Sequence, residues 1–222
     1  MIPKIIHYCW FGKKKYSPLQ KACINTWYKY LKDYKFILWN EENAPMEHPF
    51  VSYHYKKKNW AFISDFVRLY AIYNYGGIYL DVDFEILKPL DDLLYNNCFL
   101  GEELPGRITN AICGAIKGHI FFKKALEFME NRHFQKKTVM ITPEVCTIIY
   151  NRLKNRGIAN DIKIYSSEYF YPYNPFSADP QKRFLLINYI TSKTYAVHHW
   201  GHSWKQGFLK RIIRKLLLYI KK

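Results

Sequence analysis

The sequence predicts an α/β fold built on a parallel sheet, and three observations lead to it. Residues 2–10 and 35–39 are short apolar runs typical of strands, and residues 17–31 between them carry apolar side chains at helical spacing. A second helical stretch, residues 59–75, ends at a glycine pair and leads directly into another apolar strand, residues 77–80. A strand, a helix and a second strand in this order form the βαβ unit from which parallel sheets are built.

The other elements follow from the same patterns. Ser17 and Pro18 supply an N-cap and a first-turn proline for the first helix. The segment 44–58 contains two prolines and is expected to be a loop or a short helix. Further strands are expected at residues 98–102, 111–116, 162–165 and 195–199, helices at about 119–131 and 142–155, and a long surface loop at 167–183.

Composition sets the broad class of the protein. The chain has 222 residues, of which 49% are hydrophobic, so a single domain with one sizeable core is expected, over residues 1–204. It has no apolar run long enough to span a membrane, and its start lacks the layout of a signal peptide, so a cytoplasmic location is expected. The five cysteines are scattered without metal-ligand spacing and are expected to be buried thiols.

The charge balance is strongly basic. Lys and Arg number 34 and Asp and Glu 18, which gives a net charge of +16, and no acidic residue follows Asp179. Such a balance suits nucleic acid, anionic lipid or phosphorylated ligands, and by itself it does not choose among them.

An acidic pair is the most informative feature of the sequence. Asp81 and Asp83 stand two residues apart at the end of the apolar run 77–80. Side chains two apart on a strand point to the same side, and paired carboxylates together with substrate phosphates hold Mg²⁺ or Mn²⁺. The pair therefore predicts a metal site at the carboxyl edge of the sheet, where ligands usually bind. A solvated strand end would show the same Asp-x-Asp pattern.

The helix before this strand carries a second charged pair. Asp65 and Arg68 lie three residues apart, on one face of an otherwise apolar helix. The pair is either a partly buried ion pair or a group that binds sugar hydroxyls and phosphate.

Aromatic and imidazole side chains mark both ends of the predicted domain. His198, His199 and His202 stand within five residues, and neutral imidazole is a good ligand for a divalent metal. A cluster after a late strand favours a metal or phosphate site over a purely structural role. Trp10 ends the first strand, where it either belongs to the core or stacks on a nucleobase.

Four blocks of the chain resemble glycosyltransferase family 32. They are IPKIIHYCWFG at residues 2–12, TWYKYLKDYKFILWNE at 26–41, WAFISDFVRLYAIYNYGGIYLDVDFEILKPLD at 60–91 and HHWGHSW at 198–204. The family includes bacterial capsule and O-antigen transferases and yeast α-mannosyltransferases. The same layout is similar to the glucosyltransferase domains of large clostridial toxins.

The resemblance implies a GT-A fold, which is a single Rossmann-like domain with a mixed, mostly parallel sheet that binds a nucleotide sugar. It also implies a retaining transferase that requires Mn²⁺ or Mg²⁺ and moves a hexose to a glycan or a lipid-linked oligosaccharide in the synthesis of a surface polysaccharide. A UDP-hexose is the favoured donor, and GDP-mannose is the alternative.

The resemblance also implies roles for particular residues. Asp65, Arg68, Asp81 and Asp83 correspond to catalytic residues, Asp81, Asp83 and His199 to metal ligands, and Trp10, Asp65, Arg68, Tyr79, Asp81, Ser203 and Trp204 to residues that bind the nucleotide sugar. His198 and His202 remain alternatives to His199. Relatives often carry Thr-Gly-Pro near the fourth helix, where this chain has Ile141-Thr142-Pro143, so contacts with the acceptor are expected to differ there.

The final segment reads as a basic amphipathic helix. Residues 205–222 place apolar side chains on one face and lysines and arginines on much of the rest. The expectation is a peripheral anchor on the inner face of the plasma membrane; a helix docked on the domain is the alternative. A nucleic-acid-binding protein and a two-carboxylate glycoside hydrolase are competing functions, and neither explains the full order of motifs.

Overall fold

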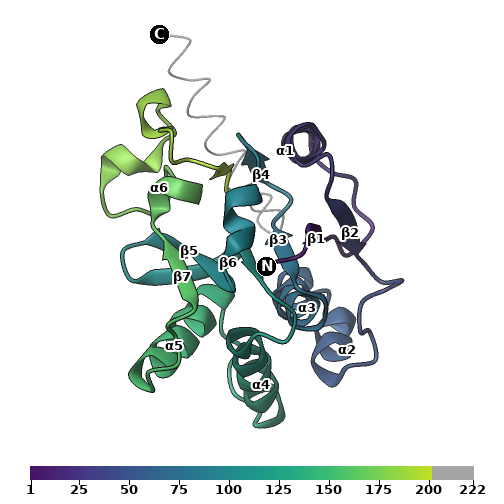
Figure 1. The fold of residues 1–222 in the computed structure, drawn as a ribbon. Coiled ribbons are helices and arrows are strands. Elements are labelled where there is room, and N and C mark those ends of the chain that lie inside the picture. Colours follow the sequence, from purple (N-terminus) through teal and green to yellow (C-terminus); the bar gives the residue numbers. More distant parts are fainter. Residues whose placement is uncertain (202–222) are drawn as a thin grey trace.

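The computed structural model describes residues 1–201. Its centre is a six-stranded sheet of order β2-β1-β3-β6-β5-β7 with helices packed around it (Figure 1). The strands are β1 (Ile5–Cys9), β2 (Lys35–Trp39), β3 (Gly77–Leu80), β5 (Cys98–Leu104), β6 (Arg107–Ala115) and β7 (Ile162–Tyr165). Strands β2, β1 and β3 run parallel, as the βαβ pattern predicts, and β7 runs parallel to β5, whereas β6 is antiparallel to both of its neighbours. The predicted α/β class with a mixed, mostly parallel sheet is confirmed.

The helices lie close to where the sequence patterns place them. They are α1 (Pro18–Tyr30), α2 (Pro49–Lys56), α3 (Trp60–Tyr75), α4 (Ile120–Phe134), α5 (Thr142–Asn155) and α6 (Ser167–Phe170), with single 3₁₀ turns at Asp91–Tyr95, Pro180–Arg183 and Ile187–Tyr189. The Ser17 hydroxyl accepts from the Gln20 amide and the Gln20 side chain accepts from the Ser17 amide, which completes a capping box at α1. Two of these short elements, α6 and the turn Pro180–Arg183, lie within residues 167–183, where the sequence predicts a loop.

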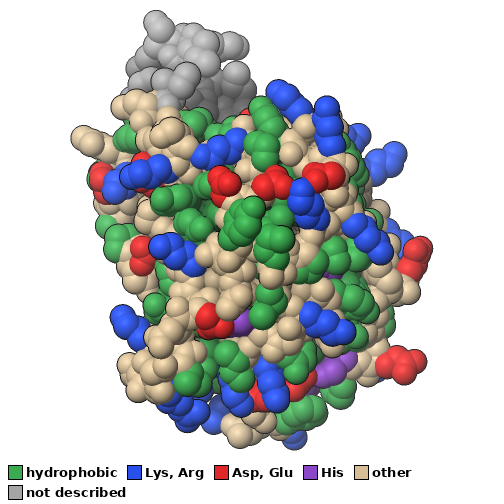
Figure 2. All heavy atoms as spheres, in the orientation of Figure 1, with side chains coloured by type: hydrophobic (Ala, Val, Ile, Leu, Met, Phe, Trp, Pro, Cys, Tyr) green, Lys and Arg blue, Asp and Glu red, His purple; other side chains and the backbone are tan. Residues whose placement is uncertain are grey.

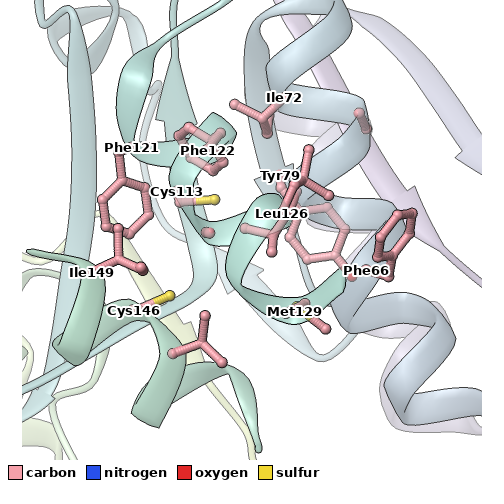
Figure 3. Close-up of a cluster of buried hydrophobic side chains, with 14 of the residues drawn as sticks. Phe66, Ile72, Tyr79, Cys113, Phe121, Phe122, Leu126, Met129, Cys146 and Ile149 are labelled. Atoms are coloured by element: carbon pink, nitrogen blue, oxygen red, sulfur yellow. The ribbon is translucent and has the colours of Figure 1, made fainter. Parts of the chain in front are cut away.

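Apolar side chains cover both faces of the sheet. Figure 3 shows one of the two buried clusters, in which side chains of α3, α4 and α5 pack against Tyr79 of β3 and Cys113 of β6. Burial in such a cluster stabilises the fold by roughly 1.5–3 kcal/mol for each fully buried large side chain. The residues that follow the parallel strands β1 and β3 are presented at one edge of this packed sheet.

A glycine turn joins α3 to β3. Gly76 and Gly77 have φ angles of 68° and 107°, a region that side chains with a Cβ rarely adopt. A Cβ on Gly77 would lie 2.7 Å from the Ile5 carbonyl oxygen, so β3 approaches β1 more closely than any other residue type would allow. His7 secures the turn, because its Nε2 lies 2.8 Å from the Gly76 carbonyl oxygen and its Nδ1 accepts from the Trp39 indole.

A second, two-stranded sheet pairs β4 (Phe84–Ile86) with β8 (Ala196–His198) in antiparallel register. The sequence patterns predict β8 but not β4, which is only three residues long and directly follows the acidic pair. This pairing brings the chain near residue 198 back to the end of β3, across more than a hundred residues of sequence.

The structure does not describe residues 202–222, so His202, Ser203, Trp204 and the predicted helix at 205–222 lie outside its described part. Within residues 1–201, no helix is long and apolar enough to cross a membrane.

Candidate active site

The two carboxylates of the acidic pair lie just beyond the end of β3. The Asp81 amide continues the ladder with β6 by donating to the Ala111 carbonyl at 2.9 Å, and the chain then turns, with the Phe84 amide donating to the Asp81 carbonyl at 3.1 Å. Both side chains are more than two-thirds buried, and they are held near each other by this turn rather than by a regular strand.

His198 completes a group with these carboxylates. Its Nε2 lies 3.1 Å from Asp83 Oδ1, and one ligand atom from each of Asp81, Asp83 and His198 lies within 4.8 Å of the others. The β4–β8 ladder causes this meeting, because Phe84 and His198 are direct partners across it. Their rings stack with centroids 4.6 Å apart, which fixes the imidazole beside Asp83.

His199, the metal ligand expected from the sequence, lies elsewhere. Its Nε2 is 2.8 Å from Glu85 Oε2. The reason is the alternation of side chains along a strand: His198 shares a face with Phe84, so the next residue points to the opposite face, where Glu85 stands. The geometry therefore assigns the position near the carboxylates to His198 instead of His199.

The chain after His199 closes around Asp83. Trp200 has a φ of 53°, a left-handed conformation that costs a non-glycine residue about 1–2 kcal/mol. This bend carries the Gly201 amide to 2.6 Å from Asp83 Oδ2. Strain of this kind is common at functional sites, where the surrounding structure enforces it.

The charges of the site influence one another strongly. Burial by itself would raise the pKa of Asp83, but the charge and hydrogen bond of His198 and the Gly201 amide lower it to about 2. Burial raises the pKa of Asp81, with Arg68 opposing the shift. Burial would lower the pKa of His198, but Asp83 outweighs it and the pKa is raised. The imidazole of His198 and the Gly201 amide thus favour the ionised form of Asp83.

Arg68 connects the helix pair to the acidic pair. One guanidinium nitrogen lies 3.1 Å from Asp65 Oδ1 and 3.1 Å from Asp81 Oδ1. The guanidinium also stacks over the Tyr79 ring, whose hydroxyl donates to Asp81 Oδ1 at 2.9 Å. Asp65, Arg68, Tyr79 and Asp81 therefore form one network. Tyr79 is only 1% exposed, so it holds Asp81 in position from the buried side of the site.

Thr142 joins this network, although no sequence pattern marked it as functional apart from the departure at Ile141-Thr142-Pro143. Its hydroxyl donates to Asp65 Oδ1 at 3.0 Å, and its side chain is buried. Burial raises the pKa of Asp65 to about 6, against the opposing charge of Arg68. The first turn of α5 thus determines how Asp65 faces the site.

Trp10 lies at the carboxyl end of β1, half-buried against the core. Its indole nitrogen donates to the Lys14 carbonyl at 2.5 Å, and its ring packs on Tyr16 with centroids 4.6 Å apart. The indole is therefore held in place while part of it remains accessible. This position is compatible with a residue of the core and also with one that stacks on a nucleobase.

Several buried polar atoms near the site lack a partner among the residues that the structure describes. They include both side-chain polar atoms of Asn110, the Tyr171 hydroxyl and His198 Nδ1. Asn110 immediately precedes Ala111, the partner of Asp81, and the Tyr171 ring lies 5.7 Å from the His198 ring. Most buried polar groups in proteins are paired, so unpaired atoms this close to the acidic pair are unusual. An Asn within the apolar run of β6 was the available sequence signal.

The residues of the acidic group fit a divalent cation. Two carboxylates and an imidazole provide the oxygen and nitrogen donors that Mg²⁺ and Mn²⁺ accept. Tyr79 and Arg68 orient Asp81, and His198 and Gly201 orient Asp83, so the donor atoms are held in place without the cation. Supporting contacts of this kind tune the affinity of metal sites.

Comparison with known proteins finds a similar family region and similar relatives. Residues 17–100 match the glycosyltransferase sugar-binding region containing a DXD motif. Inositol phosphoceramide mannosyltransferase 3 of Schizosaccharomyces pombe is 33% identical over 168 residues, which make up 68% of this chain and 45% of that protein. The chain thus spans less than half the length of this relative.

Solved structures share the fold. The PaToxG glycosyltransferase superposes with a TM-score of 0.57 at 18% identity, covering 72% of this chain and 73% of its own. A glycosyltransferase involved in glycosylation of the major capsid of PBCV-1 gives a TM-score of 0.54 at 13% identity, covering 90% and 95%. Residues 17–100 are therefore similar to the sugar-binding region of glycosyltransferases that contains a DXD motif, and the fold of the chain is GT-A.

Proposed function

We propose that this protein transfers a hexose from a nucleotide sugar to a hydroxyl of a glycan or glycolipid acceptor, with the help of Mn²⁺ or Mg²⁺ and with retention of anomeric configuration. The observation that carries the proposal is the group of Asp81, Asp83 and His198 at the end of β3, next to the network of Asp65 and Arg68. A divalent cation in this group would stabilise the charge of the departing diphosphate.

The protein's own residues bind and orient the donor. Arg68 is held by two carboxylates and a stacked ring, so its geometry is preorganised for the developing charge of the diphosphate. Asp65, oriented by Thr142, is placed to hydrogen-bond the hydroxyls of the donor sugar. Trp10 offers a planar surface for the base. Ser203 and Trp204 remain expected contacts of the β-phosphate.

The chemical step needs no covalent bond to the protein. The acceptor hydroxyl attacks the anomeric carbon from the side of the leaving group, the bond from that carbon to the diphosphate breaks, and a diphosphate oxygen takes the proton. Asn110 and Tyr171 provide unpaired polar atoms close to Asp81 and His198, and we assign them to hydroxyls of the bound sugars.

The relatives reduce the range of candidate donors and acceptors. The name of the S. pombe protein specifies a mannosyltransferase acting on inositol phosphoceramide, a lipid. The name of this relative favours a lipid-linked acceptor. It also makes GDP-mannose as strong a candidate donor as the UDP-hexoses expected from the sequence. On the face shown in Figure 2, Lys and Arg are dispersed among acidic and hydrophobic side chains, so this face does not support a nucleic-acid-binding role.

Hydrolysis of nucleotide sugars in the presence of Mn²⁺ tests the proposal. One donor among UDP-glucose, UDP-galactose, UDP-N-acetylglucosamine and GDP-mannose should be hydrolysed, and EDTA or Asp83→Asn should abolish the activity while the melting temperature is maintained. Hydrolysis that proceeds equally well with EDTA, or in the Asp83→Asn protein, would overturn the proposed role of the acidic group.

A further inference from the structure

The segment between η2 (Pro180–Arg183) and β8 exposes a run of large apolar side chains. Phe184, Leu185 and Leu186 are 63%, 36% and 47% exposed, and Ile190 follows at 36%. Single exposed apolar residues are normal on protein surfaces. Three in succession are not expected on a face that only meets water, because sequences avoid such runs unless the run has a use.

Hydrogen bonds fix the loop that exposes these apolar side chains. The Asn174 amide donates to the Lys182 carbonyl at 2.7 Å, and the Arg183 guanidinium donates to the Ser177 carbonyl at 2.7 Å. The Tyr189 hydroxyl donates to the Gln181 carbonyl at 3.1 Å, and this bond joins a residue after the apolar run to a residue before it. Asn174 and Ser177 are themselves buried, so these contacts tie the loop to the domain. The loop is therefore held with residues 184–186 pointing outward.

Cations stand directly beside this run, and the acidic side chains near it are engaged in contacts of their own, since the Asp179 carboxylate accepts from the Gln181 amide and Glu168 pairs with Lys193. Lys182 and Arg183 are exposed immediately before Phe184, and no Asp or Glu occurs anywhere after Asp179. An apolar apex flanked by cations complements the surface of a bilayer that contains anionic lipid, where apolar side chains enter the acyl boundary and cations face the phosphates.

The loop also lies next to the candidate active site. It begins after Tyr171, whose ring is 5.7 Å from that of His198, and the Tyr173 carbonyl accepts from the Trp200 indole at 3.1 Å. In Figure 1 the same segment, drawn in yellow-green beyond α6, lies at the opposite end of the molecule from α4 and α5. A bilayer that met the loop would face the end of the molecule that carries the site.

We propose that residues 182–190 form a docking loop for an anionic membrane surface, which holds the active site over acceptors embedded in that surface. The link to a lipid acceptor rests on the proposed function, whereas the docking itself does not. Each basic residue near such a surface contributes on the order of 1 kcal/mol to binding.

A fluorescent label in the loop tests the docking directly. The five native cysteines are buried, so a cysteine at Leu185 of the full chain can be labelled selectively with an environment-sensitive dye. Vesicles of phosphatidylcholine and phosphatidylglycerol should shift its emission to the blue and raise its intensity several-fold, and phosphatidylcholine alone should not. Ile158→Cys is the matched control, because Ile158 is also apolar and exposed but comes three residues after α5, the helix that lies at the opposite end of the molecule from the loop in Figure 1.

An unchanged spectrum at position 185, or an equal change at position 158, would overturn the proposal. A change that requires high protein concentration and no lipid would replace the membrane with a second copy of the chain. The triple substitution Phe184→Ser, Leu185→Ser, Leu186→Ser should lower vesicle partitioning by about tenfold or more, and equal partitioning would contradict docking by this loop.

The triple variant should hydrolyse the nucleotide sugar at the wild-type rate, because its three side chains lie outside the site. Vesicle docking without any hydrolysis by the wild-type protein would leave the loop proposal standing and remove the proposed function.

Discussion

Asn110 buries both polar atoms of its side chain, and neither has a partner among the described residues. Replacing such a group with an apolar side chain of similar size removes a desolvation penalty of roughly 1–3 kcal/mol. We expect Asn110→Leu to raise the free energy of unfolding by about that amount and to weaken donor or acceptor binding. Chemical denaturation and steady-state kinetics measure the two effects.

Asn174 provides the control, because it is equally buried but its side chain is fully paired, with the Phe176 amide and the Glu103 carbonyl. Asn174→Leu should therefore destabilise the protein. Loss of stability in Asn110→Leu, or unchanged kinetics, would show that Asn110 is not kept for a ligand.

Trp10 allows a second test at the residue scale. If its indole stacks on the base of the donor, Trp10→Ala should weaken donor binding by ~1–3 kcal/mol. Trp10→Phe should retain most of the affinity, because a planar ring remains. Equal dissociation constants for a folded Trp10→Ala protein and the wild type would assign this side chain to the core.

At the scale of elements, the glycine turn between α3 and β3 sets the position of the acidic pair. Gly77 and Gly106 both have positive φ angles, but a Cβ would meet the Ile5 carbonyl oxygen at 2.7 Å at Gly77 and nothing within 4 Å at Gly106. Gly106→Ala should cost about 1–2 kcal/mol through backbone strain alone. Gly77→Ala should cost at least about 3 kcal/mol, since a backbone oxygen must also move. Similar melting temperatures for the two variants would contradict the close approach of β3 to β1.

Most elements could be predicted from the sequence because their signals are local. Ser17 and Pro18 start α1, Gly76 ends α3, and β2 has the predicted bounds. Strand β4 was missed because three residues carry little periodicity of their own, and this strand exists only through its pairing with β8.

That pairing explains what the sequence could and could not show about the site. Asp65, Arg68 and Asp81 lie within a short stretch of sequence, and the family resemblance assigned all three to the donor site. The choice between His198 and His199 depends on which face of β8 lies against Phe84, a matter of register that sequence does not reveal. Thr142 and Asn110 reach the site only through the tertiary fold.

At the scale of the whole molecule, His7 is a neutral imidazole of β1 that links this strand to β2 and to the glycine turn. Burial lowers its pKa to about 4, partly offset by the hydrogen bond to the Gly76 carbonyl, whereas its ordinary value is 6.5. Between these values the unfolded chain binds more protons than the folded chain, so the contribution of His7 is complete above pH 6.5 and falls as the pH drops toward 4.

We therefore expect His7→Phe to be less stable than the wild type at pH 7.5, and the gap to shrink by about 2 kcal/mol at pH 5. Denaturant titrations of both proteins at the two pH values measure the change. A gap that stays constant or widens at pH 5 would show that His7 is not a buried neutral ring.

Strand β8 brings His198, and not His199, to the acidic pair. Titration of Mn²⁺ with the nucleoside diphosphate into the wild type, His198→Ala and His199→Ala tests it most directly. We expect His198→Ala to weaken binding by roughly 10–100-fold or more, and His199→Ala to remain within about twofold, with both proteins folded. Loss of binding in His199→Ala with normal binding in His198→Ala would contradict the account.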